Sequence, residues 1–237
     1  MASPEAENPY GLLPALQQGG LIAQTVFGIL VIMSMASWYI LFAKLLEQQK
    51  ILNQGKRMRA TFWNSPSIKD GAAKLEKNSA YRQIVDDGLL AQEQHTKLTD
   101  PVDQHEWLLG SLARSQAAIN SKLSNGLAVL ATVGSTSPFI GLFGTVIGIY
   151  RALVKIGAAG QASIDAVAGP VGEALIMTAL GLAVAVPAVL AYNWLLRRNK
   201  VVAEQVAAFS TDLHGYMVSA GAVKPVVSAA PAAAVKK

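Results

Sequence analysis

A single carboxylate could do chemistry inside a membrane. Glu173 lies in GPVGEALIMTALGLAVAVPAVLAYNWLLRR, residues 169–198, which holds no other charged residue before its two final arginines. A carboxylate within a bilayer costs at least about 2.5 kcal/mol and normally faces a bundle interior or a water-filled cavity, as in an ion pathway. If a helix begins at Gly169-Pro170, Glu173 instead lies in its first turn, where the helix dipole stabilises a carboxylate by about 0.3–1 kcal/mol without any function. The residues alone leave both interpretations open, and a helix that includes Asp165 would place Glu173 deeper.

Two threonines lie in apolar segments, one in the segment of Glu173 and one in the segment before it. Thr178 follows Glu173 by five residues, near enough in angle to share a broad interior face of one helix. Thr145 belongs to the preceding apolar segment GSTSPFIGLFGTVIGIY, residues 134–150. Its hydroxyl could bond a carbonyl of its own helix instead of serving a site.

Small residues line both of these segments. Gly141, Gly144 and Gly148 follow the three-and-four spacing of one helical face, and Gly181 belongs to a similar series in the later segment. Such faces let helices approach closely in a membrane, so we expect these four glycines to be helix-packing positions. The abundance of small residues also indicates an oligomer, in which these two segments make close contacts and the first apolar segment faces lipid.

The composition indicates a membrane protein that is all-α. Of the 237 residues, 52% are hydrophobic and 15% are charged, and the mean hydropathy is +0.35. Three runs are long enough to cross about 30 Å of hydrocarbon: 21–43, 127–150 and 169–196. We therefore expect three transmembrane helices, retained without a cleaved signal peptide, and long helices that extend into the cytoplasm.

The distribution of basic residues orients the three spans. Segment 1–43 has no Lys or Arg, whereas segment 44–127 has twelve, and Arg197 and Arg198 follow the third span at once. Cytoplasmic loops carry the excess of basic residues, so we expect the N-terminus in the periplasm and the C-terminus in the cytoplasm. The resulting segments are a periplasmic 1–20, a span 21–43, a cytoplasmic helical region 44–126, a span 127–150, a short periplasmic connector 151–168, a span 169–196, a cytoplasmic helix 197–220 and a disordered tail 221–237.

The cytoplasmic region should consist of helices. Thr99-Asp100-Pro101 has the capping residue and the proline of a helix start, and it predicts a helix of about fifty residues to Tyr150, roughly 75 Å long. Asn64-Ser65-Pro66-Ser67 predicts a loop. Five apolar residues at helical spacing predict a packed stripe near the C-terminus: Val202, Val206, Phe209, Leu213 and Met217.

Enzymatic, metal and nucleic-acid functions find no support in the sequence. The chain has no cysteine, and His95, His105 and His214 are scattered without metal-ligand spacing. No nucleophile, phosphate-loop or metalloprotease motif occurs. We therefore expect no enzyme activity, cofactor or metal, and we attribute the net charge of +5 to the flanks of a membrane protein and not to nucleic-acid binding.

Two segments carry a family resemblance. SPFIGLFGTVIGIY (137–150) and GPVGEALIMTALGLAVAVPAVLAYN (169–193) closely resemble the pore-helix signatures of the MotA/TolQ/ExbB proton-channel family. The three spans and the large first cytoplasmic loop are similar to the ExbB and TolQ branches, of which ExbB fits best. The four-span MotA branch fits less well.

The resemblance implies a motor subunit that uses the proton gradient. ExbB-like proteins form a homopentamer around helices of a single-span partner, ExbD. The complex drives TonB, which serves outer-membrane import of iron-siderophore complexes and vitamin B12. The TolQ branch serves the Tol-Pal envelope motor. The family's polar pore-lining positions match Thr145, Glu173 and Thr178. The resemblance thus implies lipid, ExbD-like and TonB-like partners in the bacterial cytoplasmic (inner) membrane.

Glu173 by itself is not enough for a complete proton path. No span contains an aspartate, and one carboxylate near one end of a long helix does not relay a proton across the whole membrane. The main carrier should therefore come from the partner, with Glu173 and the two threonines lining the path. The alternatives are a passive oligomeric membrane scaffold and a self-sufficient channel or transporter; three spans without an internal repeat argue against the transporter.

Overall fold

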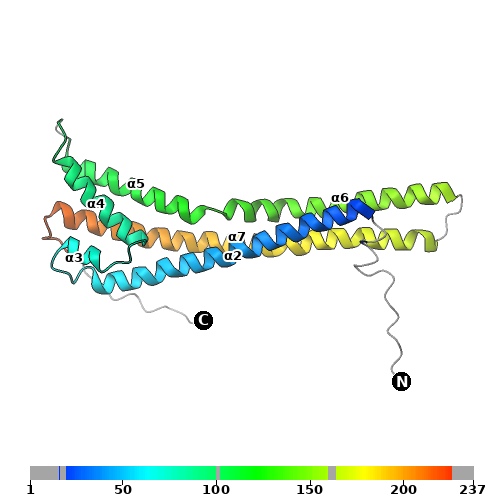
Figure 1. Ribbon diagram of the computed structural model, residues 1–237, viewed down its shortest axis with the longest axis horizontal. Helices are drawn as coiled ribbons and strands as arrows, with labels where there is room; N and C mark the ends of the chain where they lie inside the picture. The colour runs from blue at the N-terminus through cyan, green and yellow to red at the C-terminus, as the bar shows by residue number, and fades with distance from the viewer. Residues whose placement is uncertain (1–15, 17–19, 100–101, 160–163, 226–237) are drawn as a thin grey trace, which may run out of the picture. The chain divides into compact units, whose positions relative to one another are not determined.

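A computed structural model describes residue 16 and residues 20–99, 102–159 and 164–225. Within this part the chain is helical and contains no strand, as the all-α prediction requires. The helices are α2 (Gly20–Thr61), α3 (Ile68–Ala73), α4 (Ala80–His95), α5 (Gln104–Ser124), α6 (Leu127–Ala159) and α7 (Ile164–Val218) (Figure 1).

The chain divides into two compact units, and α2 and α7 contribute to both. Unit 1 contains residues 1–43 and 126–195, and unit 2 contains residues 44–125 and 196–237. In the described part of the chain, three helical stretches are long and apolar enough to cross a membrane. They begin at Gly20, Gln104 and Ala174; the first two contain the predicted spans 21–43 and 127–150, and the third contains residues 174–196 of the predicted span 169–196.

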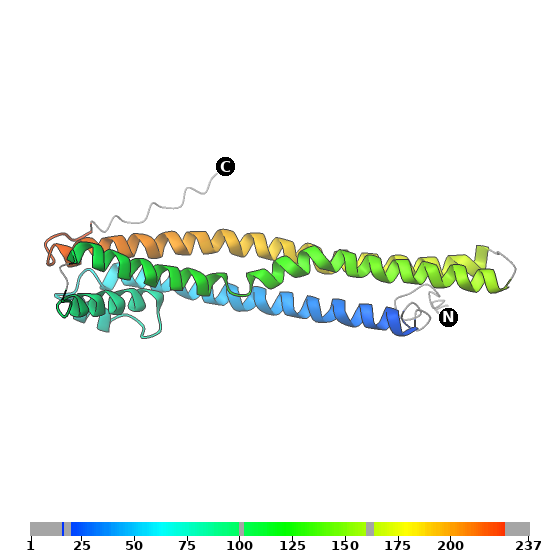
Figure 2. The same cartoon turned by 90° about the horizontal axis from the view of Figure 1, so that it is seen from above.

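Unit 1 is built from the first part of α2, α6 and the first part of α7. Helices α6 and α7 run side by side over this unit (Figure 2). On their flank, Val26 and Leu30 of α2 pack with Met177 of α7 in a small apolar cluster. A second cluster joins Leu127 and Leu130 of α6 to Ala191 and Leu195 of α7.

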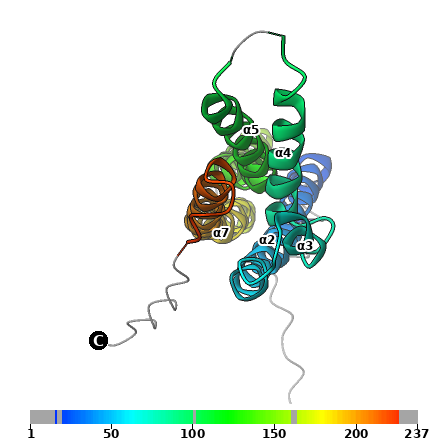
Figure 3. The same ribbon diagram turned by 90° about the vertical axis from the view of Figure 1, so that its left-hand side faces the viewer.

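Unit 2 is built around a larger core with many aromatic side chains. Phe62, Trp63, Tyr81 and Phe209 are buried there, and α4 packs along α5 (Figure 3). The predicted stripe on α7 forms one wall of this core, and all five of its members are buried: Val202, Val206, Phe209, Leu213 and Met217. The prediction of a packed stripe is thus confirmed.

Capping side chains begin the short helices of unit 2. The Ser67 hydroxyl accepts a hydrogen bond from the backbone N–H of Asp70 at the start of α3, and Ser79 does the same for Arg82 at the start of α4. Both serines satisfy amide groups that have no partner within the helix. Residues 62–67 between α2 and α3 are not helical, so the predicted loop is confirmed.

The predicted helix of about fifty residues is wrong at its start and in its middle. Asp103, not Thr99 or Asp100, caps α5, because its side chain accepts from the backbone N–H of His105. Asp100 and Pro101 lie outside the described residues. The helix is then interrupted after Ser124, because Gly126 adopts φ +84, a left-handed conformation that favours glycine.

The helices on either side of the predicted connector are longer than expected. Helix α6 continues to Ala159 and α7 begins at Ile164, so most of the segment 151–168 is helical. Gly169 and Pro170 lie inside α7 and do not start it, and α7 continues without a break from the third predicted span to Val218, two residues short of the predicted end of the cytoplasmic helix. Most of the segment 1–20 and the tail after residue 225 lie outside the described residues, so the predicted disorder of 221–237 stays a prediction.

Candidate functional site

Helices α6 and α7 touch through their backbones at two glycines. A Cβ atom built on Gly141 would lie 2.5 Å from the carbonyl oxygen of Met177, and one built on Gly181 would lie 2.7 Å from that of Ser137. Real Cβ atoms essentially never approach so closely, and the contacting atoms are backbone atoms that cannot move aside. Glycine is therefore required at both positions for this packing.

The contact continues along α6 toward its C-terminal end. A Cβ atom on Gly144 would meet the Cβ atom of Met177 at 3.2 Å, and one on Gly148 would meet that of Ala174 at 3.0 Å. The four glycines predicted as packing positions thus lie against a helix of the same chain. Their contacts do not require a second subunit, so they give no argument for an oligomer, and the pentamer stays a proposal.

Thr145 bridges the two helices through hydrogen bonds. Its side chain is buried, and Oγ1 lies 2.8 Å from the carbonyl oxygen of Ala174 and 2.5 Å from Oγ1 of Thr178. A hydroxyl carries one proton, and a carbonyl only accepts. When Thr145 donates to Ala174, Thr178 must therefore donate to Thr145, which gives an ordered chain of two hydroxyls ending on a carbonyl of α7.

The bond of Thr145 to its own helix is weaker than the bonds across to α7. The carbonyl oxygen of Gly141, four residues earlier in α6, lies 3.3 Å from Oγ1 of Thr145. This distance exceeds the common range for a hydroxyl donor. Self-bonding within α6, which the sequence left open, is thus the minor interaction, and the close approach at Gly141 is what brings α7 within reach.

The backbone position of Glu173 favours the ion-pathway interpretation over the helix-start interpretation. Helix α7 begins at Ile164 and includes Asp165, so Glu173 stands nine residues after the first helical residue. The stabilisation of a carboxylate by the helix dipole falls off within the first turn. A helix-start role therefore does not explain this residue, whose side chain lies outside the described part. The next residue is Ala174, whose carbonyl accepts the Thr145 hydroxyl.

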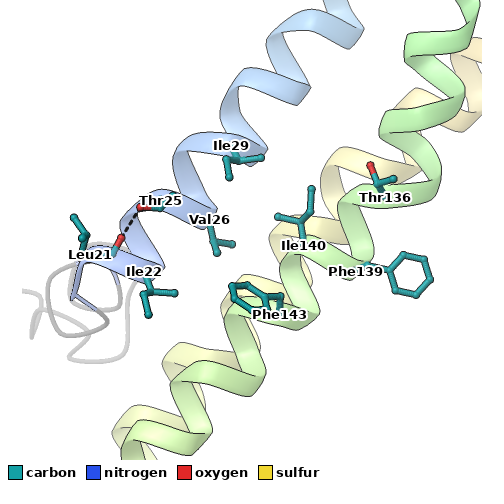
Figure 4. Close-up of a pocket in the computed structure, with 9 residues that line it drawn as sticks. All are labelled: Leu21, Ile22, Thr25, Val26, Ile29, Thr136, Phe139, Ile140 and Phe143. Carbon is teal, nitrogen blue, oxygen red and sulfur yellow. Dashed lines mark hydrogen bonds between the residues drawn. The ribbon is translucent and has the colours of Figure 1, made fainter.

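An apolar crevice of about 500 Å³ lies between α2 and α6 in unit 1 (Figure 4). Its two hydroxyls are bonded to their own helices: Thr25 donates to the carbonyl of Leu21 at 2.8 Å, and Thr136 to that of Thr132 at 2.7 Å. The other lining side chains are hydrocarbon. The crevice therefore offers no group that would hold a proton or an ion, and neither Thr145 nor Thr178 lines it.

Sequence reasoning did not find a buried polar group in unit 2. Gln48 of α2, which is 0% exposed, donates through Nε2 to Oδ1 of Asn199 on α7 at 2.6 Å. Asn199 in turn donates to the carbonyl of Leu123 at 2.9 Å, and Lys44 donates to that of Lys122 at 2.9 Å. These bonds satisfy carbonyls at the end of α5, where the helix supplies no partner. The sequence does contain one indication that Asn199 is buried: it stands three residues before Val202 and so shares the helical face of the apolar stripe.

Two of the three histidines are neighbours in the structure. The rings of His105 and His214 lie 4.5 Å apart between centroids. Among the described residues no three His, Cys, Asp or Glu side chains lie together in a way that could hold a metal ion. This pair was not foreseen, because the two residues are far apart in the sequence.

The family comparison decides the assignment. Residues 76–208, more than half of the chain, match the MotA/TolQ/ExbB proton channel family. The chain belongs to this family. The matched range contains Thr145, Glu173 and Thr178 as well as the four packing glycines.

Curated relatives place the chain nearer to ExbB than to TolQ. Biopolymer transport protein ExbB of Xanthomonas campestris pv. campestris (strain B100) is 38% identical over 86% of this chain and 84% of its own length. Biopolymer transport protein ExbB of Neisseria meningitidis (strain DSM 15465 / Z2491) is 35% identical over 84% of this chain and 93% of its own length. Tol-Pal system protein TolQ of Haemophilus influenzae (strain Rd) is 32% identical over 83% of this chain and 91% of its own length. The recognition of an ExbB-like member is confirmed.

Proposed function

We propose that this chain is an ExbB-like subunit of a proton-driven motor in the bacterial inner membrane, where it energises TonB-dependent import of iron-siderophore complexes and vitamin B12 across the outer membrane. One observation supports a proton path in particular. The hydroxyls of Thr145 and Thr178 form a hydrogen-bonded chain that ends on the carbonyl of Ala174, the residue after Glu173. Two buried or half-buried hydroxyls thereby meet between helices whose backbones touch at Gly141 and Gly181.

The motor requires partners that supply the main proton carrier. No apolar run contains an aspartate, so an ExbD-like single-span helix within a homopentamer of this chain brings that carboxylate. The motor drives a TonB-like protein. Each proton that crosses the membrane releases about 2.3 kcal/mol per 100 mV of potential. That energy is enough to bias a switch between two discrete packings of the helices. In this proposal the N-terminus lies in the periplasm and the C-terminus in the cytoplasm.

Substitution of Glu173 tests the proton path. In cells that produce the chain with its partners, we expect Glu173→Gln to abolish TonB-dependent iron uptake, because the amide keeps the shape of the side chain and removes its ionisation. Native mass spectrometry of the purified complex must show unchanged assembly. Normal uptake by the assembled variant would refute the role of Glu173 and favour a passive scaffold.

The hydroxyl chain is tested with matched threonine variants. We expect Thr145→Val and Thr178→Val to reduce uptake by about tenfold or more while assembly survives, because valine keeps the shape and removes a buried hydrogen bond. Thr136→Val is the control, since the hydroxyl of Thr136 bonds only its own helix and faces the apolar crevice. Equal effects of all three variants would assign Thr145 and Thr178 to packing.

The TolQ-like relative supports a second candidate function, in the Tol-Pal envelope motor. Complementation separates the two: we expect the chain to restore siderophore-dependent growth in cells that lack ExbB, and not detergent resistance in cells that lack TolQ. The reverse result would assign the Tol-Pal system. A proton flux through liposomes that contain this chain alone would refute the claim that a partner supplies the carrier.

A further inference from the structure

A small polar pocket lies in unit 2, apart from the hydroxyl chain. Its volume is about 210 Å³, and α2, α4 and α5 contribute its walls. The lining is mixed: four of its residues are apolar, Ile51, Ala80, Ile119 and Leu123, and six are polar, Glu47, Lys50, Gln54, Asn78, Gln83 and Lys122. The pocket has room for about seven water molecules at roughly 30 Å³ each, so it fits a small polar group and not a lipid tail.

The carboxylates around the pocket have close partners. Glu47 accepts from Nζ of Lys44 at 2.6 Å. Glu76, which stands nearby outside the lining, accepts from Nε2 of Gln54 at 2.7 Å and lies 3.5 Å from the guanidinium of Arg57. Negative charge near the pocket is therefore largely compensated.

Two lysines of the lining have only longer polar contacts. Nζ of Lys50 lies 4.0 Å from Glu76, at the limit of an ion pair, and Nζ of Lys122 lies 3.4 Å from Oε1 of Gln83. Because that amide accepts through its oxygen, its NH₂ group stays a donor, as does the amide of the exposed Asn78. The lining thus combines two ammonium groups and two amide donors, which suits an anion with several acceptor oxygens.

The position of the two lysines along the chain matches the headgroup layer of a membrane. Lys50 stands seven residues after the apolar run that ends at Ala43, and Lys122 stands five residues before the run that begins at Leu127. Because α2 is continuous here, a rise of about 1.5 Å per residue places Lys50 roughly 10 Å from the end of its apolar run. Lys122 is separated from the second run by the turn at Gly126. The headgroup region adds about 5–8 Å on each side of the bilayer, and a lysine side chain extends back toward it.

We propose that this pocket binds a phosphoryl group, with Lys50 and Lys122 as the cationic ligands and the Gln83 and Asn78 amides as further donors. The phosphate comes from the headgroup of an anionic phospholipid of the inner leaflet or from a soluble phosphate ester. The apolar residues of the lining contact the glycerol carbons in either case. The site is separate from the proton path and does not depend on the motor function.

The test measures phosphate binding to the full chain in detergent. Native mass spectrometry counts adducts of phosphatidylglycerol and of phosphatidylcholine, and ³¹P NMR follows titration with glycerol 1-phosphate. We expect Lys50→Gln with Lys122→Gln to weaken binding by at least about tenfold, because two charge-assisted contacts are lost. The control is Lys56→Gln with Lys69→Gln, which removes the same charge from two exposed lysines outside the pocket.

The outcomes separate the two sources of phosphate. Lysine-dependent adducts with phosphatidylglycerol but not with glycerol 1-phosphate assign a lipid headgroup, and lysine-dependent binding of both assigns a general phosphate-ester site. Equal weakening by the pocket and control variants, or no weakening by either, overturns the proposal. The single variant Lys50→Gln keeps the test valid if the double variant misfolds, because that side chain is 64% exposed. Circular dichroism checks its helix content.

Discussion

The two units of this protein pack their helices by different means. In unit 1 the central contact between α6 and α7 rests on glycine, and their backbones approach so closely at Gly141 and Gly181 that no side chain fits. In unit 2 the core is filled by large side chains, and Phe209 lies against the rings of Phe62, Trp63 and Tyr81 at centroid distances of 5.4–5.8 Å.

The difference follows from the surroundings that each unit requires. Lipid tails are as apolar as leucine, so burial of large side chains gives no hydrophobic gain between helices in a membrane, and close van der Waals contact must replace it. In water the burial of aromatic side chains is the dominant stabilising term. Helices α2 and α7 belong to both units and therefore change their packing residues along their length: α7 has Gly181 in one unit and Phe209 in the other.

Truncation of Phe209 should have the largest effect. We expect Phe209→Ala to lower the free energy of unfolding of unit 2 by about 3–5 kcal/mol, because the residue is buried and its contacts are rigid rings. Hydrogen-exchange mass spectrometry of peptides from α4 and α5 measures the loss. Phe139→Ala is the control in unit 1, where the side chain is 71% exposed and the change should stay within about 0.5 kcal/mol. Comparable effects of the two variants would contradict the contrast between the units.

Enlargement of a glycine should have the next largest effect, confined to unit 1. We expect Gly141→Ala to destabilise the pair of α6 and α7 by about 1–3 kcal/mol, because the added methyl group meets the Met177 carbonyl. Unfolding in mixed detergent micelles measures this change. Gly157→Ala gives the opposite sign, a gain of up to about 1 kcal/mol, because a Cβ atom there meets nothing within 4 Å and alanine favours the helix. Tolerance of alanine at Gly141 would mean that the backbones do not touch.

Alkaline pH should produce the smallest effect, and only in unit 2. Burial raises the pKa of Tyr81 above its ordinary 10.0, and the nearby charge of Arg59 opposes this in part. The unfolded chain then loses the phenol proton at a lower pH than the folded chain, so this contribution to stability is complete below pH 10 and decreases as the pH rises above 10. We expect Tyr81→Phe to reduce the loss of unit 2 stability between pH 9 and pH 11, measured by urea unfolding. An unchanged slope in the variant would show that Tyr81 ionises equally in both states.

Much of the fold could be predicted from local signals. The apolar runs, the stripe from Val202 to Met217 and the loop at residues 64–67 each depend on residues that are close in sequence, and the structure has all of them. The prediction of one helix from Thr99-Asp100-Pro101 to Tyr150 was wrong at two positions. Asp103 caps α5, and Gly126, whose φ is +84, separates α5 from α6.

The candidate site was predicted only as a set of residue types. The sequence singled out Thr145, Glu173 and Thr178, but it did not reveal that the Thr145 hydroxyl reaches a carbonyl of another helix. That bond depends on the register of α6 against α7, which is set where Gly141 meets Gly181. The buried pair of Gln48 and Asn199 depends in the same way on two helices that are about 150 residues apart in the chain.

The sequence by itself determined the helical class, the three apolar runs, the family and the polar residue types of the candidate site, because each is encoded in composition, period or motif. Only the tertiary structure decided that the small residues pack within one chain, that Thr145 and Thr178 form an ordered hydroxyl chain, and that Lys50 and Lys122 share a pocket. The physical reason is that a hydrogen bond or a packing contact requires a separation of about 3–4 Å, and for residues far apart in sequence only the arrangement of whole helices fixes that separation.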